Sequence, residues 1–596
     1  MLFFITKFNK MKNENEKQYE VVVGIDFGSS GSGYAFSFMN EKDIIHGQIP
    51  GANVDSKVPT EIILDNENYC LQFGASCKQY LKEKGYDCGH YYKDIKMQLY
   101  SRKKEIKASN SGKNLSLKLV IQRVLEKLKE LALEDLKKSW KYINENNIKW
   151  VVTVPAIWED FQKGIMMEAC KKSGLISKNT DKSLFFALEP EAASLYCSRN
   201  PNIRQEYLMK GKYYIICDLG GGTGDIVTHL VGSNKKLKEI SPSCGGAYGS
   251  NEIDKKIFSD YIQKIFRYKE FNYIHEHYNE MKISEEEEVI FDGWCELERQ
   301  IRDFKEGTNL EKINKKDKFP INCSLFQDFY EDDIDINDLI NNFNNMCDDD
   351  DLKLKVKSKK KWIIDFPYKI IHNYIQIQAN LICQKIKEIL NKIGLKKQKI
   401  DTIIFVGGYC SNEVLLSIIK KNLFEINNFL QPSNPSLAIM EGAVLFGLNP
   451  NIIDTRISKY TIGQGTRAKW DDNKHSKRGK KVYDEEDNIY RCENCFSKFI
   501  EVNQTLKINQ EITNSYKMFE PRYCKLNFYQ SKNPNPIFTF EEGVEKIGEC
   551  LIDAGRDYPV DERDIKVTMK FGGTFIDVNA KHEKSGKDFQ TSLNFS

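Results

Sequence analysis

The chain has 596 residues, of which 88 are basic and 85 acidic, so its formal net charge is only +3. A chain of this length is too long for one hydrophobic core, and two to four packed units are expected. Hydrophobic residues make up 40% of the sequence and charged residues 29%, which excludes wholesale disorder. The small net charge gives no sign of a surface tuned to nucleic acid or to an anionic membrane.

The N-terminal residues and the cysteines bear on the cellular compartment. The opening MLFFITKF is a short apolar run without a cleavage-type segment, and we expect residues 1–19 to be a disordered tail. No stretch approaches the roughly 18 consecutive apolar residues that a membrane helix needs. The 16 cysteines are scattered singly, which is typical of free thiols in a reducing compartment. We therefore expect a cytoplasmic protein without membrane insertion.

A strand, a glycine-serine turn and a second strand come first. Residues 20–38 contain VVVGID, then FGSSGSG, then YAFSF, which predicts a hairpin. Apolar residues at helical spacing over 115–140 predict an amphipathic helix, and WVVTVP at 150–155 predicts a buried strand. Strands and helices alternate, so an α/β class is expected.

Two further glycine-bearing turns follow. Residues 213–231, YYIICDLGGGTGDIVTHLV, repeat the pattern of the first hairpin, with a tip that begins at Asp218. The two tips, at Asp26 and Asp218, lie about one domain length apart, so each is expected to belong to its own lobe. Residues 401–419 predict a third strand, which ends at a glycine pair and passes into a helix.

These patterns divide the chain into two lobes and a smaller β unit. We expect lobe I at 20–209 and lobe II at 210–449, with a polar, solvated insertion at about 309–361, where charges come in blocks. The bridge at 450–489 is charged and lacks apolar spacing, which predicts a linker. Short segments such as FSKFIEV, IFTF, IKVTMKF and TFIDVNA predict a β-rich, sandwich-like domain at 490–596 that lacks a helical lid.

Glycine-rich turns suit phosphate because backbone N–H groups must approach its oxygens closely. GIDFGSSGSG and DLGGGTGD both have this property, and each carries an aspartate at the end of an apolar strand. A carboxylate there can hold Mg²⁺, most often through its water shell. Either turn alone is more simply a hairpin turn, but the three turns together favour a nucleotide site.

The order of these motifs resembles the heat shock protein 70 family of the actin-like ATPase superfamily, over about residues 21–448. GIDFGSS resembles the first phosphate loop, VVTVP the central strand, EPEAA at 189–193 a connecting motif, CDLGGGTGD the second phosphate loop and FVGGYCSNEVL the adenosine loop. The resemblance implies an α/β fold with two ribonuclease H-like lobes. It also implies a chaperone-like protein that binds ATP and Mg²⁺, hydrolyses ATP weakly, and couples the nucleotide state to lobe closure and to protein partners or client polypeptides.

The resemblance further implies roles for individual residues. Asp26 and Asp218 would orient waters bound to Mg²⁺, while Lys96 and Glu189 would position the attacking water, the γ-phosphate and the metal. The expected phosphate-binding residues of the two loops are Gly28, Ser29, Ser30, Gly220, Gly221, Gly222 and Thr223, with Thr223 also counted as catalytic. The alternatives are a surface lysine at position 96 and a structural helix-start carboxylate at position 189.

On the base side, Gly407 and Gly408 would let the main chain lie against adenosine, and Asn412 follows in the same loop. Glu298 and Arg302 resemble the pair that contacts ribose and stacks on adenine. An exposed ion pair one helical turn apart is an equally good interpretation of these two residues.

The sequence also departs from the family. The Leu-rich interdomain linker and the helical lid of typical members are absent, which disfavours both their lobe-to-lobe allostery and tight trapping of clients. These departures and the segment FSKFIEVNQTL point to a divergent branch, the heat shock 70 kDa protein 12 type. The alternative function is a nucleotide-binding scaffold or signalling protein with little or no hydrolysis. A small-molecule kinase is a third, for which the sequence shows no substrate base.

Cys492 and Cys495 form a CxxC pair that could be half of a zinc site. No second pair of Cys or His follows at a suitable spacing, so the sequence alone does not favour a metal there.

Overall fold

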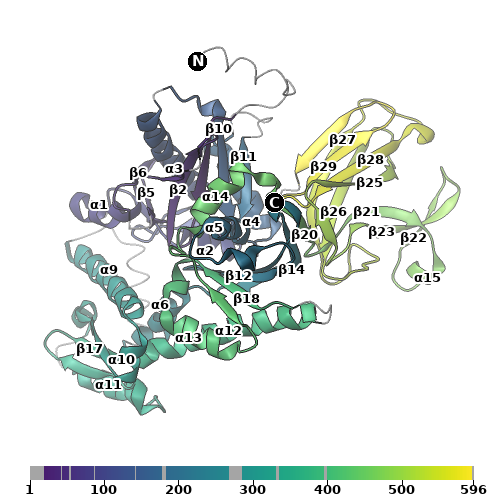
Figure 1. Ribbon diagram of the computed structural model, residues 1–596. Coiled ribbons are helices and arrows are strands. Elements are labelled where there is room, and N and C mark those ends of the chain that lie inside the picture. The colour runs from purple at the N-terminus through teal and green to yellow at the C-terminus, as the bar shows by residue number, and fades with distance from the viewer. Residues whose placement is uncertain are drawn as a thin grey trace.

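The computed structural model describes residues 19–592 apart from positions 42, 53–55, 86, 141, 177–182, 267–284, 331–333 and 395–398. The tail expected at residues 1–19 therefore lies outside the described residues, except for Tyr19. Figure 1 shows an α/β body, coloured from purple to green, with a β-rich unit in yellow beside it.

A six-stranded sheet forms the first part of the α/β body. Its order is β11 (Leu184–Leu188), β10 (Ile148–Val154), β1 (Val21–Asp26), β2 (Gly31–Phe38) and β3 (Ile45–His46), with β4 (Val58–Pro59) also paired to β2. Strands β1, β10 and β11 are parallel, and β1 and β2 form the predicted antiparallel hairpin. Every residue of β1 and β10 is buried, which explains their unbroken apolar sequence.

Helices cover both faces of this sheet. The predicted amphipathic helix is α3 (Leu117–Ser139), and its apolar stripe packs in one cluster with Val21 and Val23 of β1. Val22, which points to the opposite face of β1, packs in a second cluster with α5 (Glu189–Arg199) and α14 (Ala438–Leu448). The remaining elements before β12 are α1 (Cys77–Lys84), α2 (Ile95–Tyr100), α4 (Asp160–Lys172) and a small sheet of β6 (Cys70–Phe73), β5 (Ile62–Leu64) and β7 (His90–Tyr92).

The second sheet repeats the order of the first. It runs β19 (Asn428–Leu430), β18 (Thr402–Val406), β12 (Tyr213–Leu219), β13 (Gly224–Val231), β14 (Leu237–Gly246), β20 (Ile453–Ile457) and β24 (Thr505–Lys507). As in the first sheet, three parallel strands are followed by antiparallel ones. Helix α14 packs on β1 and β10, and α5 packs on β12 and β13, so this helix pair joins the two sheets. This mixed α/β arrangement is consistent with an Hsp70 or actin-like fold.

The segment 309–361 is folded, although the sequence predicts a solvated insertion. It contains α10 (Leu310–Asn314), β15 (Lys318–Asn322), α11 (Ile336–Asn344) and β16 (Lys355–Ser358), and its strands pair with β17 (Ile363–Pro367). Phe326, Leu339 and Phe343 are buried in the same core cluster as α9 (Glu285–Glu306) and α12 (Tyr368–Gly394). The charge blocks stay at the surface while the few large apolar side chains turn inward, and this arrangement corrects the expectation.

The expected linker at 450–489 is also largely structured. Strand β20 joins the second sheet beside β14, and β21 (Thr461–Lys469), α15 (Asp472–His475) and β22 (Lys481–Asp484) follow. Arg467 and Lys469 are exposed at the end of β21, whereas Arg456 of β20 is buried in an ion pair. The strands of this segment are held by pairing with distant strands, so no apolar periodicity marks them in the sequence.

The β-rich unit consists of two antiparallel sheets that share one hydrophobic cluster. The five-stranded sheet runs β22, β23 (Ile489–Ile500), β21, β26 (Tyr523–Ser531) and β27 (Val544–Asp553); the four-stranded sheet runs β25 (Gln510–Lys517), β28 (Asp564–Phe571), β29 (Asp577–His582) and β30 (Asp588–Ser592). Phe528 from the first sheet and Val567 from the second meet in the shared cluster.

Within the described residues, no helix is both long and apolar enough to cross a membrane. All sixteen cysteines lie in the described part of the chain, and each is a free thiol.

Candidate nucleotide site

The two glycine-rich tips contact each other. A Cβ atom built on Gly221 would lie 1.8 Å from Ser30 Oγ, and one on Gly222 would lie 2.5 Å from Ser29 Oγ. Ser30 Oγ also donates to Asn251 Oδ1 at 3.2 Å, and the Asn251 backbone N–H donates to the Gly221 carbonyl at 2.8 Å. The hairpins of the two sheets therefore come together at their tips.

Asp26 ends β1 beneath the first tip. Its carboxylate accepts hydrogen bonds from Lys57 Nζ at 2.6 Å and from Thr153 Oγ1 at 3.1 Å. Burial alone would raise the pKa of Asp26, but the charges of Lys57 and Lys96 outweigh it and hold the pKa below its usual value. Asp26 is therefore an ionised, buried acceptor.

Lys96 and Glu189 form a buried ion pair in which Lys96 Nζ donates to Glu189 Oε1 at 2.6 Å. Lys96 is only 4% exposed, so it is not a surface lysine. Burial disfavours its charge, yet the carboxylates of Glu189 and Asp26 keep its pKa above normal. Burial raises the pKa of Glu189 to about 7, even though the Lys96 charge acts in the opposite direction.

Two more buried aspartates complete the acidic group. Burial, followed by the charges of Glu189 and Asp225, raises the pKa of Asp218 well above its usual value. Asp225 Oδ1 accepts the Ile157 backbone N–H at 2.9 Å, whereas its Oδ2 is buried and has no hydrogen-bond partner among the described residues. Burial raises the pKa of Asp225 to about 6. Carboxylates held this closely repel one another, and a divalent cation with its water shell would relieve that repulsion.

The third glycine turn lies against the second. Gly407 has a φ of +87°, and a Cβ on it would lie 2.6 Å from Asp218 Oδ1, so only glycine fits there. A Cβ on Gly408, in contrast, would meet nothing within 4 Å. Backbone at Gly408 is thus accessible beside the acidic group, which suits an approaching ligand.

Other predicted base-side residues already have structural partners. Asn412 caps α13 (Glu413–Asn422), where its Oδ1 accepts the Leu415 N–H at 3.0 Å. Glu298 on α9 accepts a hydrogen bond from Lys93 and lies 3.6 Å from Lys78 Nζ. Arg302 is exposed on the same helix. Glu298 therefore links α9 to the first lobe, and it is not the exposed ion-pair member considered from sequence.

The sequence did not reveal several neighbours of the acidic group. Lys57, which immediately precedes β4, reaches Asp26, and its Nζ also donates to the Ser436 carbonyl at 2.8 Å. Met97 packs against the tips, with its Sδ 3.6 Å from Ser29 Oγ. Of these residues, Thr153 offered a signal, since it is the polar residue within the buried strand WVVTVP.

A second ionic group ties β20 to the start of α5. Arg456 donates two hydrogen bonds to Glu191, each 2.7 Å long, and both side chains are buried. Next to it, the Ile457 N–H donates to Glu239 Oε2 at 2.9 Å, and Lys459 donates to the Ala156 carbonyl. Helix α5 therefore carries Glu189 toward the acidic group and Glu191 toward β20, the strand of the second sheet that precedes the β-rich unit.

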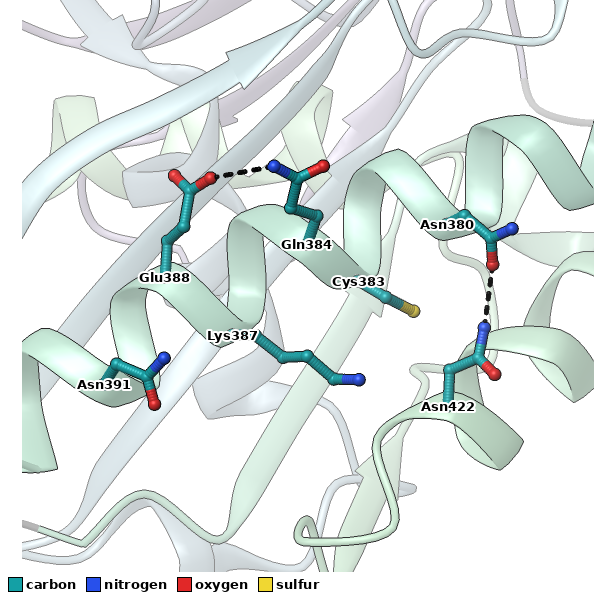
Figure 2. Close-up of a pocket in the computed structure, with 7 residues that line it drawn as sticks. All are labelled: Asn380, Cys383, Gln384, Lys387, Glu388, Asn391 and Asn422. Atoms are coloured by element: carbon teal, nitrogen blue, oxygen red, sulfur yellow. Dashed lines mark hydrogen bonds between the residues drawn. The ribbon is translucent and has the colours of Figure 1, made fainter.

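A pocket between α12 and α13 contains none of the predicted residues (Figure 2). Asn380 and Asn422 face each other across it with a 2.9 Å hydrogen bond, and Gln384 donates to Glu388 at 3.3 Å. The pocket is lined mainly by polar side chains and has a single acidic residue, Glu388. It is therefore not part of the candidate site.

The sequence is similar to a protein family and to several known proteins. A family model described as Hsp70 protein matches residues 84–289. Heat shock 70 kDa protein 12A of Homo sapiens is 26% identical over 98% of this chain and 93% of its own length, and heat shock 70 kDa protein 12B of Homo sapiens is 25% identical over 98% and 92%. The chaperone protein HscA homolog of Rickettsia felis is 29% identical over 35% of this chain and 30% of its own length. These matches support a nucleotide-binding, Hsp70-like protein. Residues 84–289 thus match the Hsp70 family model, and the resemblance to the heat shock 70 kDa protein 12 type that the motifs predict is confirmed at low identity.

Proposed function

We propose that this protein binds ATP with Mg²⁺ where the glycine tips meet and hydrolyses it slowly, as a chaperone-like switch. The observation that carries the proposal is the contact of Gly221 and Gly222 with Ser29 and Ser30, directly beside the buried acidic group. In this proposal residues 20–209 and 210–449 are the two lobes, and residues 490–596 present a partner-binding surface.

Each buried side chain has a role in this proposal. Asp26, Asp218 and Glu189 would hold Mg²⁺ through water, and the metal would supply charge stabilisation to the phosphoryl group. Lys96 would hold the attacking water, and Thr223 and the glycine N–H groups would hold phosphate oxygens. Gly407 and Gly408 would face adenosine. Arg302 is exposed on α9, so it would contact adenine only after the nucleotide has bound.

The tips meet without room for a side chain, so ligand entry requires them to separate. A nucleotide that binds between them favours a different lobe separation from the one seen here, and this difference in affinity would make the nucleotide a switch. Because α5 also carries Glu191, such a movement would reach Arg456 and the β-rich unit.

The decisive experiment is single-turnover hydrolysis of Mg-ATP by wild-type protein and by Asp218→Asn, with ATP binding measured in parallel. We expect slow turnover in the wild type and a loss of about 10²-fold in the variant, the size typical of removing one charge-stabilising group. Asp561→Asn, at an exposed position of the β-rich unit, is the matched control and should keep wild-type turnover.

An unfolded polypeptide added to the same assay separates the candidate functions. Acceleration by the polypeptide would support the chaperone-like switch. ATP binding with no turnover in the wild type would instead favour the nucleotide-dependent scaffold, and equal turnover in wild type and Asp218→Asn would overturn the site.

A further inference from the structure

Three side chains of the kinds that bind metals meet in the β-rich unit, away from the candidate nucleotide site. His475 is the last residue of α15, and Cys492 and Cys495 belong to β23. One ligand atom from each lies within 4.8 Å of the others, and all three residues are buried. Cys495 Sγ lies 3.8 Å from His475 Nε2.

The backbone of β23 is shaped so that both sulfurs reach the same place. In a regular strand, residues three apart point to opposite faces. Asn494, between the two cysteines, has a φ of +58°, and the pairing of β21 with β23 shifts register between Thr466 and Ala468. This irregularity turns Cys492 and Cys495 toward one another, since Cys492 Sγ and Cys495 Sγ both belong to the compact group.

The surroundings are apolar and hold the imidazole in place. Ala468, Trp470 and Phe538 pack with the two cysteines in one small cluster. The His475 ring lies 5.5 Å from the Trp470 ring and 6.1 Å from the Phe538 ring. An apolar shell of this kind lowers the local dielectric and strengthens the attraction between a cation and thiolates.

We propose that His475, Cys492 and Cys495 bind a zinc ion as a Cys₂His site, with water as the fourth ligand. Thiolate and imidazole are the ligands that zinc prefers, and each cysteine thiol releases its proton to solvent on binding. With ordinary Zn–S and Zn–N bond lengths, a tetrahedral site places sulfur and nitrogen about 3.6 Å apart. The observed 3.8 Å between Cys495 Sγ and His475 Nε2 is close to that separation.

Binding has a structural consequence at the imidazole. His475 Nδ1 accepts the Asp471 backbone N–H at 2.9 Å, so the neutral ring carries its proton on Nε2, the atom that faces Cys495. A metal at Nε2 displaces that proton, and a neutral ring must then carry it on Nδ1. The Asp471 N–H bond is therefore lost on metal binding, and we expect faster amide hydrogen exchange at Asp471 in the zinc-loaded protein.

The third ligand explains why the pattern is hard to see in the sequence. His475 precedes the CxxC pair, and the antiparallel pairing of β22 with β23 returns the chain so that Cys492 lies opposite Lys481, a few residues after His475. The histidine therefore lies on the N-terminal side of the CxxC pair, and a ligand pattern that continues after Cys495 does not contain it.

The test is the metal content of the full-length protein purified without added metal. We expect about one zinc ion per chain, and an affinity at least tenfold weaker in Cys492→Ser, Cys495→Ser and His475→Ala. Cys524→Ser is the matched control, because Cys524 lies on β26 outside the cluster, and it should retain zinc. Equal zinc content in the ligand variants and the control would overturn the proposal.

A cobalt titration of chelator-treated wild-type protein keeps the test independent of how the variants fold. We expect the absorption of tetrahedral, thiolate-bound Co²⁺ to saturate at about one equivalent. Absence of these bands would overturn the proposal. So would mass spectrometry that finds a Cys492–Cys495 disulfide in freshly purified protein, since that result identifies a redox dithiol instead.

Discussion

Ser30 occupies the space that any side chain at Gly221 would need, since a Cβ at Gly221 would lie 1.8 Å from Ser30 Oγ. The two residues are far apart in sequence and lie in the turns of two hairpins that belong to different sheets. Their contact brings the two hairpins together at the point where the nucleotide is proposed to bind.

Gly221→Ala is expected to weaken Mg-ATP binding by at least tenfold, because its methyl group would occupy the space in which phosphate oxygens must approach the backbone N–H groups of the second tip, and overpacking of this kind costs about 1–3 kcal/mol. Isothermal titration calorimetry measures the binding, and circular dichroism checks the fold. Gly232→Ala is the control, since a Cβ there lies 3.3 Å from its nearest contact, outside the site. Equal affinities for the two variants would show that the tips do not control nucleotide binding.

Lys96→Met leaves Glu189 buried without its counter-charge. We expect hydrolysis to fall by roughly 10²-fold, as for loss of a positioned charge near a transferring phosphoryl group. Lys103→Met, at an exposed position nearby, should keep wild-type turnover. If Lys96→Met hydrolyses ATP as fast as Lys103→Met, the pair has only a structural role.

His229 makes the stability of the second lobe depend on pH. Its buried ring lies 2.9 Å from Ser194 Oγ, and burial, assisted by the Arg456 charge, lowers its pKa from 6.5 to about 3. The native state keeps the ring neutral, so this contribution to stability is complete above pH 6.5 and is lost as the pH falls toward 3. Between these values the wild type should lose about 1.4 kcal/mol per pH unit relative to His229→Gln.

Urea denaturation at several pH values measures this difference. Ser194→Ala serves as the control, because it removes the hydrogen bond and lowers stability at every pH without removing the titrating ring. Parallel pH profiles for wild type and His229→Gln would contradict the assignment.

Arg456→Met leaves Glu191 as an unpaired buried charge and should destabilise the protein by about 3–5 kcal/mol. Adding Glu191→Gln removes that charge and should recover part of the loss, which a double-mutant cycle measures. Arg522 makes a similar fork with Asp553, but both side chains are about two-fifths exposed, at 39% and 41%. Arg522→Met should therefore cost less than about 1 kcal/mol. Similar losses for the two arginine variants would refute this argument.

The elements with strong local signals were predictable. Both glycine-tipped hairpins, α3 and the strand–turn–helix at residues 401–419 occur where the sequence places them. A hairpin depends on a turn between two apolar runs, and a surface helix on its apolar stripe, so a short window contains the information. The segment IFTF, which the sequence predicts as a strand, is an exception: it forms no strand, and Phe538 makes one isolated β-bridge, to Cys495.

Contacts between distant segments were not predictable. Lys57 meets Asp26, and His475 meets the CxxC pair, only because the fold brings their elements together. The prediction of a linker at 450–489 was wrong for the same reason, because β20 pairs with β14, which lies more than two hundred positions earlier in the chain. Within the site, motif resemblance placed Lys96 and Glu189 together, and the structure adds that both are buried.

Strand β20 also determines where this chain can be divided. Strands β20 and β24 are hydrogen-bonded members of the second sheet. A truncation that removed the chain from residue 453 onward would therefore expose the edge of β14 and leave the buried Glu191 carboxylate without its Arg456 partner. Recombination at a boundary before residue 453 could therefore not exchange the β-rich unit between proteins without disrupting the second sheet. A protease that releases it must first break a sheet, so the two parts are expected to resist separation and to be degraded together.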